Sequence, residues 1–193
     1  MADKFQNKYR IPSARAVWHD YNGGDYFITI CTSGREHYFG EILNGEMVLN
    51  GLGMELNNTI AEIPTHHPYA KIPIYQIMPN HVHLIVCIDG TGAAGRDVAC
   101  RRDAACHVST TTKRMDADKK MQEIADQCGL LSIAIGGMKS ALTKYANSNK
   151  IEFGWQTRFH DHIIRDREEW ERIANYIENN PATWKDDRLY TDR

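Results

Sequence analysis

Residues 78–86 read MPNHVHLIV, a turn followed by two histidines at the start of an apolar run. The run continues to Ile88 and is rich in β-branched residues, which predicts a strand over 81–88. Apolar residues at both odd and even positions predict a central strand that is covered on both faces. Side chains two positions apart share a face, so His81 and His83 point the same way. Two imidazoles on a covered face need partners, and either a metal ion or hydrogen bonds would supply them.

The segments around this strand predict the remaining elements of the fold. Aromatic and β-branched runs predict strands over 25–32 and 71–77, and Pro73 places the second one at an edge or a bulge. Asn44-Gly45 between two short apolar runs predicts a two-residue hairpin. A short strand or turn is expected within 155–164.

Three stretches with apolar residues three and four positions apart predict helices, over 52–63, 130–147 and 167–180. Pro64 is expected to end the first helix, Ser132 to cap the second, and Pro181 to end the third. The resulting order is strand, hairpin, helix, strand, strand, helix, possible strand, helix. This order predicts an α+β fold, an antiparallel sheet with helices packed on one face.

Length and composition favour one soluble domain over residues 1–193. Residues 89–125 are rich in Gly, Ala, Thr and charge, which predicts a flexible or inserted segment. Cys100, Cys106 and His107 within it match no standard zinc spacing. No run is long enough for a membrane helix and no secretory signal is present, so a cytoplasmic protein without a membrane partner is expected. The five cysteines form no CxxC pair, which argues against a disulfide framework.

The charge distribution is compatible with a nucleic-acid partner, although the net charge of −2 is not typical of one. Residues 1–19 contain four basic side chains and one acidic side chain, and residues 96–120 contain seven and four. Such patches can bind phosphate even when the total charge is slightly negative, but each is equally typical of a solvated surface.

Tyr176 and Asn180 are four residues apart in the last predicted helix and therefore lie on one face, a turn apart. If this helix lies over the sheet, an amide oxygen can join the two histidines as a third metal ligand, and the phenol can act as a nucleophile. The alternative is that Tyr176 is a core aromatic residue. Tyr145, with Asn149 at the same offset, is a rival nucleophile on the preceding helix.

Two of these motifs resemble those of a known enzyme family. PNHVHLIV is similar to the HUH motif, histidine-hydrophobe-histidine, of IS200-like single-tyrosine transposases. YIENNP, residues 176–181, resembles their catalytic segment, and its Asn-Pro is similar to the branch called REP-associated tyrosine transposases. Further segments look like that branch in the same order: GDYFITICT, FGEILNGEMVLNGLG, GGMKSALTKYAN and WQTRFHDHIIRD. The resemblance covers most of the chain apart from residues 89–125.

The resemblance implies a ferredoxin-like fold with the HxH pair on a central strand. It implies Mg²⁺ or Mn²⁺ bound by His81, His83 and Asn180, and attack by Tyr176 on single-stranded, hairpin-containing DNA. The products would be a 5′-phosphotyrosine and a 3′-OH, and the strand could then be rejoined. A monomer with Tyr176 acting in cis is favoured, although a dimer is possible. Candidate contacts to the DNA backbone are Arg10, Arg15, Lys139, Lys144, Arg158 and Arg165.

Other functions remain as alternatives. A nucleotide hydrolase of the histidine-triad kind needs a third histidine where this chain has Ile85, and a zinc deaminase needs a PCxxC that is absent. A sheet that binds single-stranded nucleic acid without catalysis, including a degenerate transposase, would not need a metal or Tyr176. The second HxH, His160-Asp161-His162, is expected to line the site or contact DNA.

Overall fold

The computed structural model describes residues 19, 21–90 and 113–192, except for the side chains of 113–128. Its main sheet contains four antiparallel strands in the order β4-β5-β1-β6. The elements are β1 (Gly24–Cys31), β2 (Gly40–Leu43), β3 (Glu46–Leu49), α1 (Gly51–His66), β4 (Ala70–Met78), β5 (His81–Ile88), α2 (Lys113–Ser148), β6 (His160–Ile164) and α3 (Arg167–Asn179), with short 3-10 turns at Ser33–Arg35 and Trp184–Asp186. Apart from the β2–β3 hairpin and α3, this is the βαββαβ order of a ferredoxin-like fold. The predicted α+β, ferredoxin-like class is confirmed, and β5, which carries the HxH pair, is a central strand.

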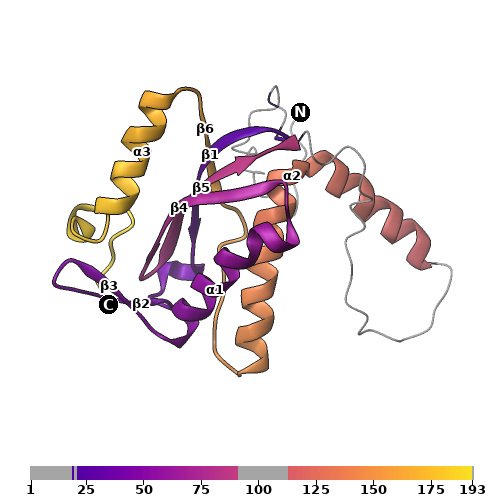
Figure 1. The fold of residues 1–193 in the computed structure, drawn as a ribbon. Coiled ribbons are helices and arrows are strands. Elements are labelled where there is room, and N and C mark those ends of the chain that lie inside the picture. Colours follow the sequence, from indigo (N-terminus) through magenta and orange to yellow (C-terminus); the bar gives the residue numbers. More distant parts are fainter. Residues whose placement is uncertain (1–18, 20, 91–112, 193) are drawn as a thin grey trace, which may run out of the picture.

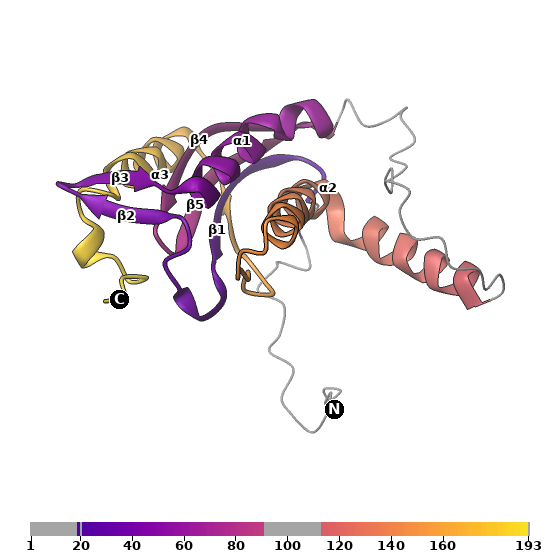
Figure 2. The same cartoon turned by 90° about the horizontal axis from the view of Figure 1, so that it is seen from below.

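The two faces of the sheet are covered by different helices (Figures 1 and 2). α1 and α2 pack on the face that presents Ile28 and Leu84, whereas α3 packs on the face that presents Ile85. The prediction of helices on one face is therefore right for α1 and α2, while α3 lies on the opposite face. The physical reason is that β5 is apolar at alternate positions on both sides, so each face needs its own cover.

The edge strand and the hairpin form as the sequence predicts. β4 lies at the edge of the sheet, and its pairing with β5 shifts register between Lys71 and Ile74, around Pro73. In the β2–β3 hairpin, Asn44 and Gly45 both have positive φ, 54° and 82°. This pair of left-handed residues matches the twist of a two-residue hairpin.

Helix α1 begins where Asn50 caps it and continues past the predicted end at Pro64. The Asn50 side chain accepts hydrogen bonds from the amides of Leu52 and Gly53, 3.0 Å each. Pro64 lies in the last turn and the helix runs to His66, so the prediction that Pro64 ends it is wrong. A proline this close to the end removes one hydrogen bond only, and the His67 amide still donates to the Ile63 carbonyl oxygen.

Helix α2 is interrupted at Gly129, whose backbone is non-helical with φ 70° and ψ 162°. Beyond it, the Leu130 amide donates to the Asn22 side-chain oxygen at 3.1 Å. The helix is thus capped by a residue distant in sequence, and the prediction that Ser132 is the N-cap is wrong. The Ser132 hydroxyl lies inside α2, buried and without a hydrogen-bond partner among the described residues.

The segment predicted to be flexible or inserted is partly helical, because residues 113–125 belong to α2. Residues 91–112, with Cys100, Cys106 and His107, lie outside the described residues. In the part of the chain that the structure describes, none of the helices has both the length and the hydropathy needed to cross a bilayer.

Candidate metal and nucleophile site

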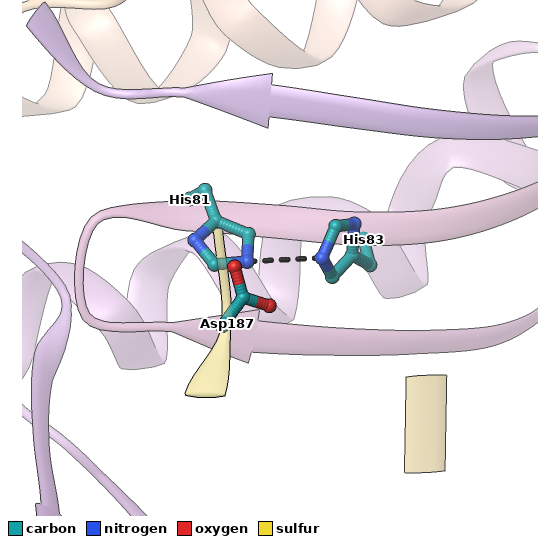
Figure 3. Close-up of side chains that lie close together, drawn as sticks. All are labelled: His81, His83 and Asp187. Carbon is teal, nitrogen blue, oxygen red and sulfur yellow. Dashed lines mark hydrogen bonds between the residues drawn. The ribbon is translucent and has the colours of Figure 1, made fainter. Parts of the chain in front are cut away.

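The two histidines of β5 lie side by side on the sheet face that α3 covers. His81 is fully buried and His83 is 3% exposed. Their Nε2 atoms are 3.0 Å apart (Figure 3). Two ligand atoms that are each about 2.1 Å from an ion and at right angles to one another are about 3.0 Å apart. The pair therefore has the spacing of adjacent ligands in an octahedral site.

Hydrogen bonds to the other ring nitrogens orient both imidazoles. His81 Nδ1 lies 2.7 Å from Asn80 Oδ1, and the Asn80 amide nitrogen donates to the Leu189 carbonyl oxygen at 2.8 Å. Asn80 Oδ1 is thus the acceptor, so His81 Nδ1 carries the hydrogen and Nε2 presents a lone pair. His83 Nδ1 lies 2.9 Å from the Thr29 hydroxyl, which can donate or accept and so supports either tautomer.

Helix α3 brings Tyr176 to this pair. The Tyr176 hydroxyl lies 3.4 Å from His83 Nε2, and its ring packs edge-on against Phe27. Tyr176 is 46% exposed, so the alternative of a core aromatic residue is wrong. Tyr145, the rival nucleophile, is partly buried against the core between the sheet and α1–α2, on the face opposite the histidines.

Asn180 follows the last residue of α3, and its side-chain amide contacts Asp187 beside the histidines. Ile177 and Ile173 of the same helix are buried against the sheet, which holds this turn in place. The Asn180 amide nitrogen donates to Asp187 Oδ2 at 2.7 Å. Its Oδ1 is buried and has no hydrogen-bond partner among the described residues. A buried carbonyl oxygen without a partner is unfavourable, so this atom fits a metal ligand.

Asp187 is the site residue that the sequence patterns do not predict. It follows the 3-10 turn Trp184–Asp186, and its carboxylate reaches back over the histidines (Figure 3). Ligand atoms of His81, His83 and Asp187 all lie within 4.8 Å of one another, and these three residues form a group that can hold a metal ion. No motif marks Asp187 in the sequence, because the segment after Pro181 has no periodicity. Its only signal is an acidic pair, Asp186-Asp187, shortly after the Asn-Pro.

Burial determines the protonation of the histidines and the tyrosine. Burial lowers the pKa of His83 to about 4, although the Asp187 charge acts in the opposite direction. The pKa of His81 is lowered well below its usual 6.5, mainly by burial and to a smaller extent by the neighbouring His83. Burial and the charge of Asp187 raise the pKa of Tyr176 to about 12. At neutral pH both imidazoles are neutral, as metal ligands must be, and the phenol is protonated.

The carboxyl group of Asp187 is ionised at neutral pH. Burial alone would raise its pKa, but hydrogen bonds from Asn180 and from the Leu189 amide lower the pKa overall. The site thus combines two neutral imidazoles and one amide oxygen, ligand types suited to a divalent cation, with one carboxylate beside them.

The predicted DNA-contact residues are dispersed over the described structure. Lys139 and Lys144 lie on α2 and line a groove with Trp155, where the Lys139 ammonium donates to the Gln156 carbonyl oxygen at 2.7 Å. Arg158 and Arg165 are exposed before and after β6. Arg10 and Arg15 lie outside the described residues. The structure does not bring this set together at the histidines.

The second HxH motif does not join the first. His160 and His162 are exposed on edge strand β6, and register pairs His160 with Thr29. The His162 ring lies 2.8 Å from Glu169 Oε1 of α3, which attaches the strand to the start of that helix. His162 is thus used in packing, while His160 lies two strands from His83.

Comparisons with known proteins find a sequence relative and solved structures with some similarity. No family model matches. A solved REP-associated tyrosine transposase bound to a REP hairpin is similar at 16% identity, covering 92% of this chain and 73% of that one, with a TM-score of 0.48. A candidate transposase from Deinococcus radiodurans is similar at 16% identity, covering 81% and 90%, with a TM-score of 0.36. Both TM-scores lie below 0.5.

The sequence relative is an uncharacterised protein from Haemophilus influenzae. It is 32% identical over 182 residues, which cover 93% of each chain. Identity at this level over nearly the full length of both proteins shows common descent. The chain belongs to the same protein family as this Haemophilus influenzae protein.

Proposed function

We propose that the protein is a metal-dependent single-stranded DNA endonuclease and strand transferase that uses Tyr176 as its nucleophile. The observation that carries this proposal is the position of the Tyr176 hydroxyl, 3.4 Å from the Nε2 of His83 and partly exposed, beside two buried histidines at metal-ligand spacing. The sequence resemblance to the HUH transposases, which rests on HVH and YIENNP, is a second support.

The metal would be Mg²⁺ or Mn²⁺, held by His81, His83 and the Oδ1 of Asn180. These residues fit such an ion because the Nε2 atoms have the spacing of adjacent ligands and the amide oxygen is buried without a partner among the described residues. When bound, the cation supplies positive charge that polarises the scissile phosphate and offsets the charge that develops on it.

The chain's own residues account for the rest of the reaction. Asn80 and Thr29 keep the two imidazoles oriented with Nε2 toward the site. Phe27 and Asp187 hold the phenol, and its partial exposure lets a DNA phosphate approach. The Tyr176 oxygen forms a bond to phosphorus, the phenolic proton is lost, and the 3′-oxygen leaves with its electron pair and takes up a proton. The product is a 5′-phosphotyrosine that a second 3′-OH can resolve.

The substrate would be single-stranded DNA beside a hairpin, as the resemblance to the REP-associated branch implies. Tyr176 reaches His83 of its own chain, so the tyrosine would act in cis and one chain would carry a complete site. Lys139, Lys144, Arg158 and Arg165 remain candidates for backbone contacts away from the cleavage point.

The test is incubation of the protein with labelled single-stranded hairpin DNA and Mn²⁺, followed by a denaturing gel. A covalent band should form and should be lost with Tyr176→Phe and with EDTA. Tyr145→Phe is the matched control, because this tyrosine lies on the other face of the sheet, and its band should persist. A band that survives Tyr176→Phe, or that does not need metal, would refute the proposal.

A second candidate function is binding of single-stranded nucleic acid without cleavage. The raised pKa of Tyr176, about 12, is compatible with it, since a protonated phenol is a weak nucleophile unless it is activated. This function predicts retention of the hairpin DNA on a native gel with no covalent band from the wild type at any pH.

A further inference from the structure

We infer that Asp187 is a positioning residue that holds the Asn180 amide with its oxygen directed to the metal site and holds the Tyr176 phenol beside it. This inference rests on the proposed function, because it concerns how the same site is assembled. It assigns Asp187 a role outside the ligand set, acting through two residues at the end of α3.

The carboxylate of Asp187 selects the orientation of the Asn180 amide. An amide presents an oxygen on one side and a nitrogen on the other, and either can face a given neighbour. An ionised carboxylate only accepts hydrogen bonds, so it must face the nitrogen. Asp187 Oδ2 lies 2.7 Å from Asn180 Nδ2 and therefore selects this orientation. The amide oxygen is then the atom left for an ion, and it is the atom found buried without a partner among the described residues.

The same carboxylate holds the phenol. The Tyr176 hydroxyl donates to the same Asp187 oxygen at 3.1 Å. One carboxylate oxygen thus bridges the proposed nucleophile and the proposed third ligand, which are a helical turn apart. This shared acceptor fixes the phenol within 3.4 Å of His83 Nε2, although the Tyr176 ring is partly exposed.

Both carboxylate oxygens of Asp187 accept hydrogen bonds from protein donors. Oδ2 accepts from Asn180 and Tyr176, and Oδ1 accepts from the Leu189 amide at 2.6 Å. A carboxylate held by three charge-assisted hydrogen bonds is fixed where it is, so it can orient the two side chains that donate to it. Substitution of a residue that orients a metal ligand typically lowers metal affinity although the residue does not touch the ion.

The segment 187–189 also orients His81, through Asn80. The Leu189 carbonyl oxygen accepts from the Asn80 amide nitrogen at 2.8 Å, and Asn80 Oδ1 accepts from His81 Nδ1. Residues 187–189 therefore set the orientation of one ligand on β5 and one ligand after α3. The tail that follows α3 connects two parts of the site that the sheet and the helix supply separately.

The experiment is a double-mutant cycle on Mn²⁺ affinity, measured by calorimetry without DNA. Asp187→Asn should weaken Mn²⁺ binding by about 10–100-fold, the usual effect of removing a residue that orients a ligand. In an Asn180→Ala background the same change should have little further effect, because the amide through which Asp187 acts is gone. Asp186→Asn is the matched control, since it removes one exposed negative charge from the adjacent position and should leave affinity unchanged.

A spectroscopic measurement reports the orientation itself. In ¹⁵N-labelled protein, the Asn180 side-chain amide, identified by its loss in Asn180→Ala, should exchange slowly in the wild type and rapidly in Asp187→Asn. Thermal unfolding of each variant checks that the fold is retained.

The outcomes separate this inference from the proposed function. If Asp187→Asn weakens binding equally in both backgrounds, Asp187 is a ligand in its own right and the inference is overturned. The inference is also overturned if Asp187→Asn leaves both affinity and amide exchange unchanged. If the wild type binds no Mn²⁺, the metal-dependent function falls and the inference falls with it.

Discussion

Acid should destabilise the metal-free protein through the buried histidine pair. Burial lowers the pKa of His83 from its usual 6.5 to about 4 in the folded state. The unfolded chain therefore binds a proton at a pH where the folded chain does not, and stability falls as the pH falls. The contribution is fully present above about pH 6.5 and disappears as the pH approaches about 4.

The size of the effect follows from the two pKa values. At about 1.4 kcal/mol per pH unit, lowering the pKa of His83 from 6.5 to about 4 corresponds to about 3 kcal/mol of folding free energy. His81 acts in the same direction, because its pKa is also lowered. The two effects are not additive, since the Nε2 atoms are 3.0 Å apart and the first proton bound hinders the second.

The assay is urea unfolding in EDTA at several values between about pH 7 and about pH 4. Wild type should lose about 3 kcal/mol more than His83→Gln over this range, since glutamine does not titrate. His160→Gln, which removes an exposed histidine from β6, should retain the wild-type pH dependence. Parallel curves for wild type and His83→Gln would refute the reasoning and would mean that the His83 imidazole is not held neutral by burial.

Three substitutions test the packing of α1 and α3 on the two faces of the sheet. Asn50→Ala removes the cap of α1 and should lower the free energy of unfolding in urea by about 1 kcal/mol; an unchanged value would contradict the capping role. Gly53→Ala would place a Cβ 2.2 Å from the Phe39 carbonyl oxygen. It should therefore lower the unfolding temperature although alanine favours helices, and a more stable variant would contradict the contact. Ile177→Ala should cost about 2–5 kcal/mol by leaving a cavity under α3. If it lost adduct formation at unchanged stability, α3 would not depend on this packing.

Much of the fold follows from local patterns in the sequence. The apolar run after His81 predicts a central strand because both of its faces are apolar, and Asn44-Gly45 predicts the hairpin because both residues tolerate positive φ. The N-cap of the helical part of α2 that begins at Leu130 could not be predicted in this way. It is the Asn22 side chain, more than a hundred residues away, and a contact over that separation has no periodic signature.

In the candidate site, too, spacing predicts some features and only the tertiary structure determines the others. Because side chains two apart in a strand share a face, the spacing of His81 and His83 places both rings on the same face. Because side chains four apart in a helix are neighbours, the spacing of Tyr176 and Asn180 places them on one face, a turn apart. Whether that turn faces the histidines depends on which face of the sheet α3 covers. The structure places α3 over Ile85, which brings Tyr176 to the histidines and leaves Tyr145 on the other side.

By itself, the sequence determined the strands, the helices and the faces on which the two histidines and the Tyr176–Asn180 pair lie, because these depend on the period of each element. Only the tertiary structure decided which partners these residues have. Thr29 meets His83 through strand register, and Asp187 meets Asn180 through a turn that folds back after α3. Such contacts depend on how distant segments pack against one another, which the spacing of neighbouring residues does not specify.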